Sequence, residues 1–251
     1  MRRGWKAPVL CLVASTRSSF GFATSRNNIN HKRRMSSEVM TNESFEKTEQ
    51  SWRLLLETSI NKSRKIRGSN YVQLATANKD GEPRCRTVVF RGFLNNLPTN
   101  HTMAINGGYC DDKPCVMKMC TDLRSKKVEE VAKGGEMVWW FPKTSEQYRV
   151  RGSVLLIGGE NDDRALQIAR KELWGNLNDA ARESFLNGPI MNGGRDEEGK
   201  VVPPPKNFLL MLLDPIYVDY LLLKGAQYRQ IDQRHDDNNS QSYWSFKEVD
   251  P

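Results

Sequence analysis

The sequence predicts a mainly β protein with peripheral helices. Short runs rich in β-branched and aromatic residues recur along the chain, and residues 71–77 and 146–157 are clear examples. Hairpin turns such as residues 78–81 (Asn-Lys-Asp-Gly) join neighbouring runs directly. The helical segments do not alternate regularly with strands. This arrangement favours an antiparallel barrel over a doubly wound parallel sheet.

The first half of the chain is predicted to be rich in strands. Trp52, Leu55, Leu56 and Ile60 recur at helical spacing, which predicts a first helix over residues 49–65. A second, short helix is expected over residues 125–133, because Gly134-Gly135 would end it. The expected strands are residues 71–77, 82–94, 115–119, 136–141 and 146–157. In the fourth strand, alternation predicts that the rings of Trp139 and Trp140 face opposite sides of the sheet.

The second half begins with helices and returns to strands. Residues 161–163 can cap a helix that runs to Trp174 and buries Leu166, Ala169 and Leu173. A further helical piece is expected over residues 179–186. Residues 188–205 combine Gly, Pro and charge, which predicts an exposed loop. The remaining expected strands are residues 208–213, 216–223, 226–231 and 243–249.

The net charge of +8 is located in the first 37 residues. They contain eight basic residues and no acid, so the remainder balances 30 basic against 30 acidic residues. A neutral body argues against nucleic-acid binding. Residues 1–37 read as a removable mitochondrial or plastid transit peptide, with a secretory signal or a disordered tail as alternatives. Residues 38–49 would be a linker and residues 50–251 the folded domain; no apolar run approaches the roughly 20 residues of a membrane span.

Cysteine and histidine usage makes hydrolytic chemistry a poor explanation. Outside the first 37 residues the only histidines are His101 and His235, which leaves little basis for a Ser/His/Asp or Cys/His mechanism. Cys110, Cys115 and Cys120 are spaced by five, without a CxxC pair. Reduced thiols in and beside a strand explain them better than a zinc site, which stays the alternative.

Two segments predict an anion site. In residues 83–91 the strand pattern puts Arg86, Val88 and Phe90 on one face and Thr87, Val89 and Arg91 on the other. Residues 121–127 supply hydroxyls, ammonium groups and free N–H groups at a helix start, which suits a phosphate. The alternatives are a solvated edge strand and a wet helix face whose lysines pair with Glu129 and Glu130.

In order and spacing, these motifs over residues 50–251 resemble the pyridoxamine 5'-phosphate oxidase-like FMN-binding split-barrel family. The resemblance implies that Lys126, Lys127 and Arg86 neutralise the FMN phosphate. It also implies that the backbone of residues 87–89 and the amide of Gln147 hold the ring, with Arg91 adding positive charge beside it. A homodimer is implied too, because the pocket in this family lies between two subunits. The implied cofactor-binding residues are Arg86, Thr87, Val88, Val89, Arg91, Cys120, Thr121, Ser125, Lys126, Lys127, Gln147 and, as a looser match, Arg229.

The departures from the family concern substrate recognition. The Arg-Leu-His-Asp element of the oxidases is absent, since residues 225–229 read Gly-Ala-Gln-Tyr-Arg. Leu221 stands where the family has a tryptophan, and residues 174–182 match none of the substrate-phosphate contacts. We expect an FMN-dependent oxidoreductase of unknown substrate. A non-catalytic FMN-binding or flavin-sensing protein is the alternative, and a barrel that binds haem or no ligand is a third.

Overall fold

The computed structural model describes residues 50–105, 109–186, 193–236 and 242–251. The expected presequence (1–37) and linker (38–49) lie outside these ranges, as do residues 188–192 of the expected loop. The described residues belong to the compact unit Lys47–Pro251.

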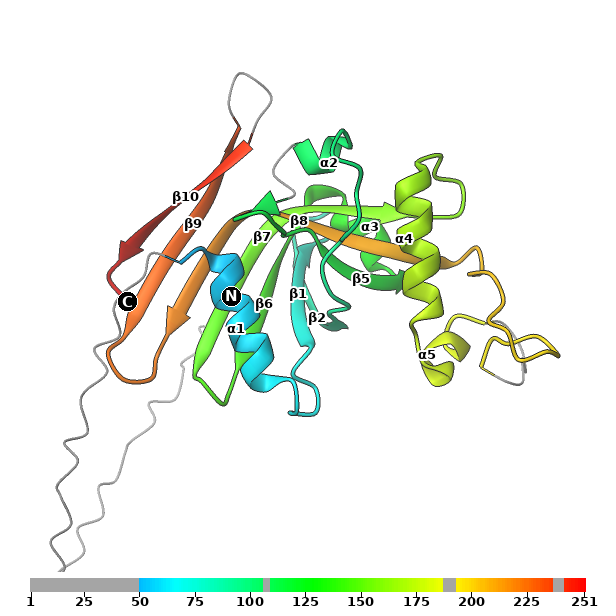
Figure 1. The fold of residues 1–251 in the computed structure, drawn as a ribbon, viewed down its shortest axis with the longest axis horizontal. Helices are drawn as coiled ribbons and strands as arrows, with labels where there is room; N and C mark the ends of the chain where they lie inside the picture. Colours follow the sequence, from blue (N-terminus) through cyan, green and yellow to red (C-terminus); the bar gives the residue numbers. More distant parts are fainter. Residues whose placement is uncertain (1–49, 106–108, 187–192, 237–241) are drawn as a thin grey trace, which may run out of the picture. The chain divides into compact units, whose positions relative to one another are not determined.

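One antiparallel sheet dominates the fold (Figure 1). Seven of its eight strands follow the order β10-β9-β8-β7-β6-β1-β2, and the eighth, β5, pairs with β8 off this path. A separate two-stranded sheet consists of β3 (Tyr109–Cys110) and β4 (Lys113–Pro114). The strands of the main sheet are β1 (Tyr71–Ala77), β2 (Pro83–Val89), β5 (Met117–Asp122), β6 (Gly135–Phe141), β7 (Glu146–Ile157), β8 (Phe208–Leu222), β9 (Tyr228–Asp236) and β10 (Ser242–Val249).

A short ladder after β2 closes this sheet into a barrel. The Arg91 N–H donates to Lys118 O and the Leu94 N–H donates to Val116 O, each over 2.8 Å. The ring therefore runs β1-β2-β5-β8-β7-β6 and back to β1. The β9–β10 hairpin stays outside the ring, because β9 pairs with residues 217–222 of β8 whereas β5 pairs with residues 208–213. The predicted split β-barrel is confirmed.

The prediction of two strands over residues 208–213 and 216–223 is wrong. Pro215 lies between the two expected strands, but β8 continues through it as one strand of 15 residues. The ladder between β7 and β8 has a bulge between Arg151 and Gly152, and Gly152 pairs with Pro215. A bulge accommodates a residue that lacks an N–H. Gly152 is required there, since a Cβ would lie 2.0 Å from Asp214 O.

Helices cover two separate cores. Helix α1 (Trp52–Ser63) buries Trp52 and Leu56 against the inward side chains of the barrel. Helix α4 (Arg164–Gly175) buries Leu166, Ala169 and Leu173 against the other core. The carboxylate of Asp163 caps α4 by accepting from the Leu166 N–H over 3.0 Å. Two of the shorter helices are α2 (Thr102–Ile105) and α5 (Asp179–Glu183).

The predicted helix over residues 125–133 is shorter than expected and divided. Helix α3 spans Lys127–Glu130, and a 3₁₀ turn, η1, follows over Val131–Lys133. Gly134 ends the turn at a φ of 84°, a conformation that glycine adopts readily. A helix of four residues has only a small macrodipole. Any anion at this point must therefore be held mainly by side chains.

Buried polar contacts hold α1 on the barrel. Ser59 lies 2.9 Å from Glu146 Oε2 and 2.8 Å from the Tyr148 hydroxyl. At the start of α1, the Trp52 N–H donates to Asp232 Oδ1 over 3.1 Å, and the Gln230 amide donates to the other carboxylate oxygen over 2.9 Å. Asp232 is 1% exposed, and burial raises the pKa of its carboxyl to about 6.

This carboxyl predicts a stability that falls as pH rises. In the unfolded chain its pKa is about 3.9, so the protonated form is favoured in the folded state. Its stabilising contribution is complete below about pH 4 and is lost as pH passes about 6, at most about 3 kcal/mol. We expect the free energy of unfolding of the wild type, minus that of Asp232→Asn, to decrease across this window in urea titrations. Parallel pH curves would contradict the assignment.

Candidate functional site

Strand β2 presents an open backbone edge. The Phe90 N–H, just after β2, donates to Asn70 O over 2.8 Å on the β1 side. Because N–H and C=O groups alternate sides along a strand, Thr87 and Val89 direct theirs to the opposite edge. The only ladder partner of β2 within the described residues is β1, and β5 joins only after residue 90. This edge is therefore available to a ligand.

Arg86 is fixed at the inner face of β2. Its Nη1 donates to Thr76 Oγ1 over 2.5 Å, and its Nη2 forms an ion pair with Glu130. The Thr76 hydroxyl donates to Glu130 Oε2 over 2.8 Å, which closes a triangle. The predicted alternation is confirmed here, because Val88 on the same face is 8% exposed whereas Thr87 is exposed.

Lys127 lies beside this triangle. Its Nζ donates to Thr121 Oγ1 over 3.0 Å and to Ser125 Oγ over 2.7 Å. Burial, and then the neighbouring charge of Arg86, lower the pKa of Lys127. Lys126 is exposed, since consecutive helix residues point about 100° apart.

Arg91 and Cys120 adjoin the same cluster. The thiol of Cys120 is hydrogen-bonded to the Arg91 side chain, and burial raises the pKa of this thiol. Arg91 Nε is buried and has no hydrogen-bond partner. A buried donor without an acceptor is costly, so a ligand oxygen or nitrogen would satisfy it. This orphan donor fits a polar ligand such as the FMN that the sequence predicts.

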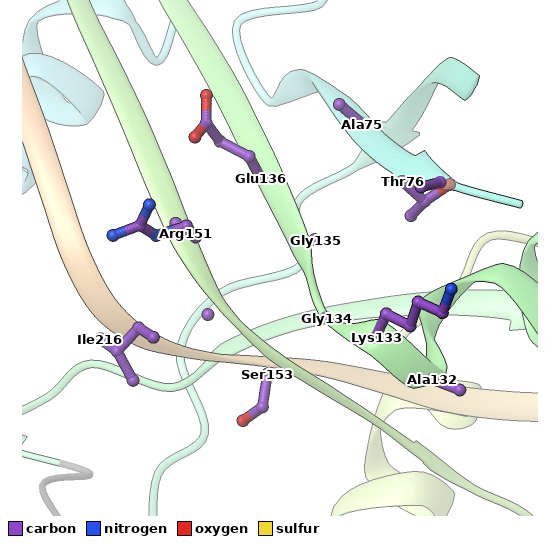
Figure 2. Close-up of a pocket in the computed structure, with 12 residues that line it drawn as sticks. Ala75, Thr76, Ala132, Lys133, Gly134, Gly135, Glu136, Arg151, Ser153 and Ile216 are labelled. Carbon is purple, nitrogen blue, oxygen red and sulfur yellow. The ribbon is translucent and has the colours of Figure 1, made fainter. Parts of the chain in front are cut away.

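An open pocket of ≈650 Å³ lies near this cluster, on the outer face of the barrel (Figure 2). Its volume is in the usual range for small-molecule sites. Gly134 and Gly135 lie at its centre between the side chains of Lys133 and Arg151. Thr76 lines it and also contacts Arg86. The other lining residues are Ala75, Ala77, Ala132, Glu136, Gly152, Ser153 and Ile216.

A row of outward-facing residues crosses the same face. Strand registers pair Trp140 with Gln147, Gln147 with Leu221, and Leu221 with Arg229. Trp140 is 42% exposed and Trp139, on the inward face, is 1% exposed, so the predicted alternation of the two rings is confirmed. Tyr71, on β1, is 51% exposed. This outward surface therefore carries two exposed aromatic side chains, Tyr71 and Trp140.

Gln147 and Arg229 lie apart from Arg86 and Lys127. Gln147 precedes Gly152 by five residues, or about 17 Å along a strand, and Gly152 pairs with Gly135 next to η1. Arg229 donates from Nε and Nη2 to Asp219 over 3.1 and 2.9 Å. Arg149 pairs with the same carboxylate.

Most of the predicted site residues do converge. The structure brings Arg86, Thr121, Ser125 and Lys127 together, with Arg91 and Cys120 adjoining and the backbone of residues 87–89 at the open edge. Sequence reasoning missed the roles of Thr76 and Glu130. The spacing of Lys127 and Glu130, three residues apart on a helix, was the available signal.

Apart from Glu130, the acid nearest to this site is already engaged, and no metal cluster adjoins it within the described residues. Asp122 is engaged by Arg124, which lowers the pKa of its carboxyl to about 2, and by Asn207. Across residues 50–251, leaving out the undescribed gaps, no group of three or more His, Cys, Asp or Glu is placed to hold a metal. The helices in these ranges include none with the length and apolarity of a membrane span.

Known proteins share this fold and its motifs. Residues 49–158 match the family described as "Pyridoxamine 5'-phosphate oxidase, FMN-binding domain". The chain is 32% identical over 209 residues to pyridoxine/pyridoxamine 5'-phosphate oxidase 2 of Arabidopsis thaliana, covering 80% of this chain and 96% of that protein.

Solved structures agree. A pyridoxamine 5'-phosphate oxidase-related, FMN-binding protein of Nostoc punctiforme is 32% identical, with a TM-score of 0.61 over 80% of this chain and 98% of its own. PhzG of Burkholderia lata shares the fold at 16% identity, with a TM-score of 0.54 over 79% of this chain and 91% of its own.

Fold and matches together define an FMN-binding split barrel. The chain belongs to the pyridoxamine 5'-phosphate oxidase family, and its cofactor is FMN.

Proposed function

We propose that this protein is an FMN-dependent oxidoreductase. The observation that carries the proposal is the convergence of Arg86, Lys127 and two hydroxyls beside the open edge of β2. Bound FMN supplies the chemistry by accepting a hydride on its ring. The protein then needs to bind, orient and shield the cofactor, so the scarcity of histidine is no obstacle.

The phosphate would lie between Arg86 and Lys127. Lys127 already points at Thr121 and Ser125, whose hydroxyls can turn to donate to phosphate oxygens. Lys126 is exposed and would contribute from the outer side of the site. Thr121 is 3% exposed, so its hydroxyl is held in place by packing.

The ring would lie along β2 and onto the outer face of the barrel. Outward N–H and C=O groups of Thr87 and Val89 match the alternating polar edge of a flavin. The buried Arg91 Nε is the donor that lacks an acceptor, and it adds positive charge beside the ring. Cys120 packs against Arg91 and limits access of water to it.

We further propose a homodimer through the outer face. Tyr71 and Trp140 form part of a surface that also includes Ile216 and Leu223, which are 40% and 46% exposed. Exposed aromatic and aliphatic side chains on one face mark an interaction surface. Because Gln147 and Arg229 lie on this face and apart from the phosphate residues, a second subunit can complete the flavin pocket.

The substrate is proposed to differ from pyridoxamine 5'-phosphate. The Arabidopsis relative is named as a pyridoxine/pyridoxamine 5'-phosphate oxidase, but among the described residues neither Arg182 nor Arg229 is free to bind a substrate phosphate. Arg182 is 1% exposed and donates to Gly193 O and Leu177 O while pairing with Asp179. Arg229 is engaged by Asp219. The same observation supports the second candidate, a non-catalytic FMN-binding or flavin-sensing protein.

A flavin reduction assay distinguishes the two candidates. We expect the purified protein to be yellow, to lose its visible absorbance when NAD(P)H or an amine is added without oxygen, and to regain it in air. Persistence of the oxidised spectrum with every donor class would favour the non-catalytic alternative. A colourless protein that takes up no added FMN would contradict both.

Replacing Lys126 and Lys127 by Ala should release FMN from a folded protein. Charge-assisted phosphate contacts contribute roughly 1.5 to 3 kcal/mol each, so affinity should fall at least about 100-fold. Most of this loss should appear in Lys127→Ala alone, because Lys127 makes the inward contacts. Lys62→Ala, an exposed lysine on α1, is the matched control. An unchanged dissociation constant in the double variant would disprove this phosphate site.

Turnover of pyridoxamine 5'-phosphate should be at least about 1,000-fold poorer than for a dedicated oxidase, a loss of about 4 kcal/mol in transition-state stabilisation. The substrate dianion would lack a partner, and burying an unpaired charge costs several kcal/mol. Steady-state oxygen consumption measures this. A kcat/KM of roughly 10⁴ M⁻¹s⁻¹ or more would show that a clamp exists.

A further inference from the structure

We infer that Glu130 is a positioning residue of the phosphate site, which acts with Thr76 to hold Arg86 beside Lys127. The inference rests on the proposed assignment of this site to the FMN phosphate. Glu130 does not contact the FMN phosphate. It orients the guanidinium of Arg86, which contacts the phosphate.

Arg86 and Lys127 are two cations that act on one another in this site. The positive charge of Arg86 contributes to lowering the pKa of Lys127. The two positive charges repel one another, and this repulsion is stronger where solvent is partly excluded. The Arg86 side chain is 21% exposed. Without a counter-charge, the guanidinium would move towards solvent and away from Lys127 before any phosphate arrived.

Glu130 is the acid placed to prevent this. Its side chain is 10% exposed and contacts Arg86 directly, and its charge also acts on Lys127. The nearby Asp122 pairs with Arg124 and Asn207 rather than with Arg86, although its charge also acts on Lys127. Hydrogen bonding from Thr76, followed by the charge of Arg86, lowers the pKa of Glu130, which keeps it ionised at neutral pH.

Two side chains orient the Arg86 guanidinium. Nη1 of Arg86 is held by Thr76 and Nη2 by Glu130, so the guanidinium plane is fixed at two points. Lys127 and Glu130 lie three residues apart on α3, so one helical turn supplies both the cation and the carboxylate. A pre-oriented donor binds an anion more tightly, because less side-chain freedom is lost on binding.

Flavins with and without a phosphate test this inference. Dissociation constants of FMN and riboflavin are measured for the wild type, Glu130→Ala, Glu130→Gln and Glu129→Ala. Glu129 is an exposed neighbour on the same helix and serves as the matched control. Thermal unfolding confirms that each variant is folded. Thr76→Val is measured as well, because it removes one of the two side-chain contacts of the Arg86 guanidinium even if Glu130→Ala fails to fold.

We expect Glu130→Ala to weaken FMN binding at least about tenfold, the worth of one charged hydrogen bond, and to leave riboflavin binding unchanged. Glu130→Gln should restore only part of the FMN affinity, since its amide oxygen can accept from Arg86 and Thr76 but supplies no counter-charge. Thr76→Val should show a smaller, FMN-specific loss. Glu129→Ala should bind both flavins as the wild type does.

Other outcomes separate the role of Glu130 from the assignment of the phosphate site. Equal losses for FMN and riboflavin in Glu130→Ala would show a general structural role and overturn the inference. Loss of FMN affinity in Lys127→Ala but not in Glu130→Ala or Thr76→Val would also overturn it, while leaving the phosphate site intact. Unchanged FMN affinity in Lys127→Ala and Glu130→Ala alike would contradict the phosphate site itself.

Discussion

The long strand β8 is hydrogen-bonded to β7 along one edge and divided along the other between β5 and β9. Residues 208–213 are all buried, so this half holds the barrel ring and the core under α4 together. The other half carries the β9–β10 hairpin outside the ring. In the ladder with β7 a bulge lies between Arg151 and Gly152, where Gly152 pairs with Pro215. It lets β8 continue through both halves without a break in its ladder with β7.

The position of the site follows from this division. Because β5 pairs only with the first half of β8, its last residues, Cys120 to Asp122, extend beyond the short ladder with residues 91–94. The β2 edge stays open at the same end of the barrel. Hydroxyls and cations from β2, β5 and α3 meet there, and the glycines at the η1–β6 junction leave the adjoining pocket unfilled.

Charge balance is central to the proposed phosphate site. Glu130 pairs with Arg86, and Thr76 is hydrogen-bonded to both, so the guanidinium is held in place without a bound anion. Arg182, Arg229 and Arg149 show the opposite arrangement. Each of them is engaged by backbone carbonyls or by a carboxylate, which disfavours their use for a second phosphate.

The sequence by itself determined the local features of this protein. Short-range periodicity and motif spacing predict most strand and helix positions, the faces of Val88 and Trp139, the cap at Asp163 and the proposed anion-binding residues on β2 and α3. Only the tertiary structure decided that β8 passes through Pro215, that Glu130 pairs with Arg86 rather than with a lysine of its own helix, and that Gln147 lies away from Lys127. These depend on strand register and on contacts between residues far apart in the chain, which local pattern does not encode.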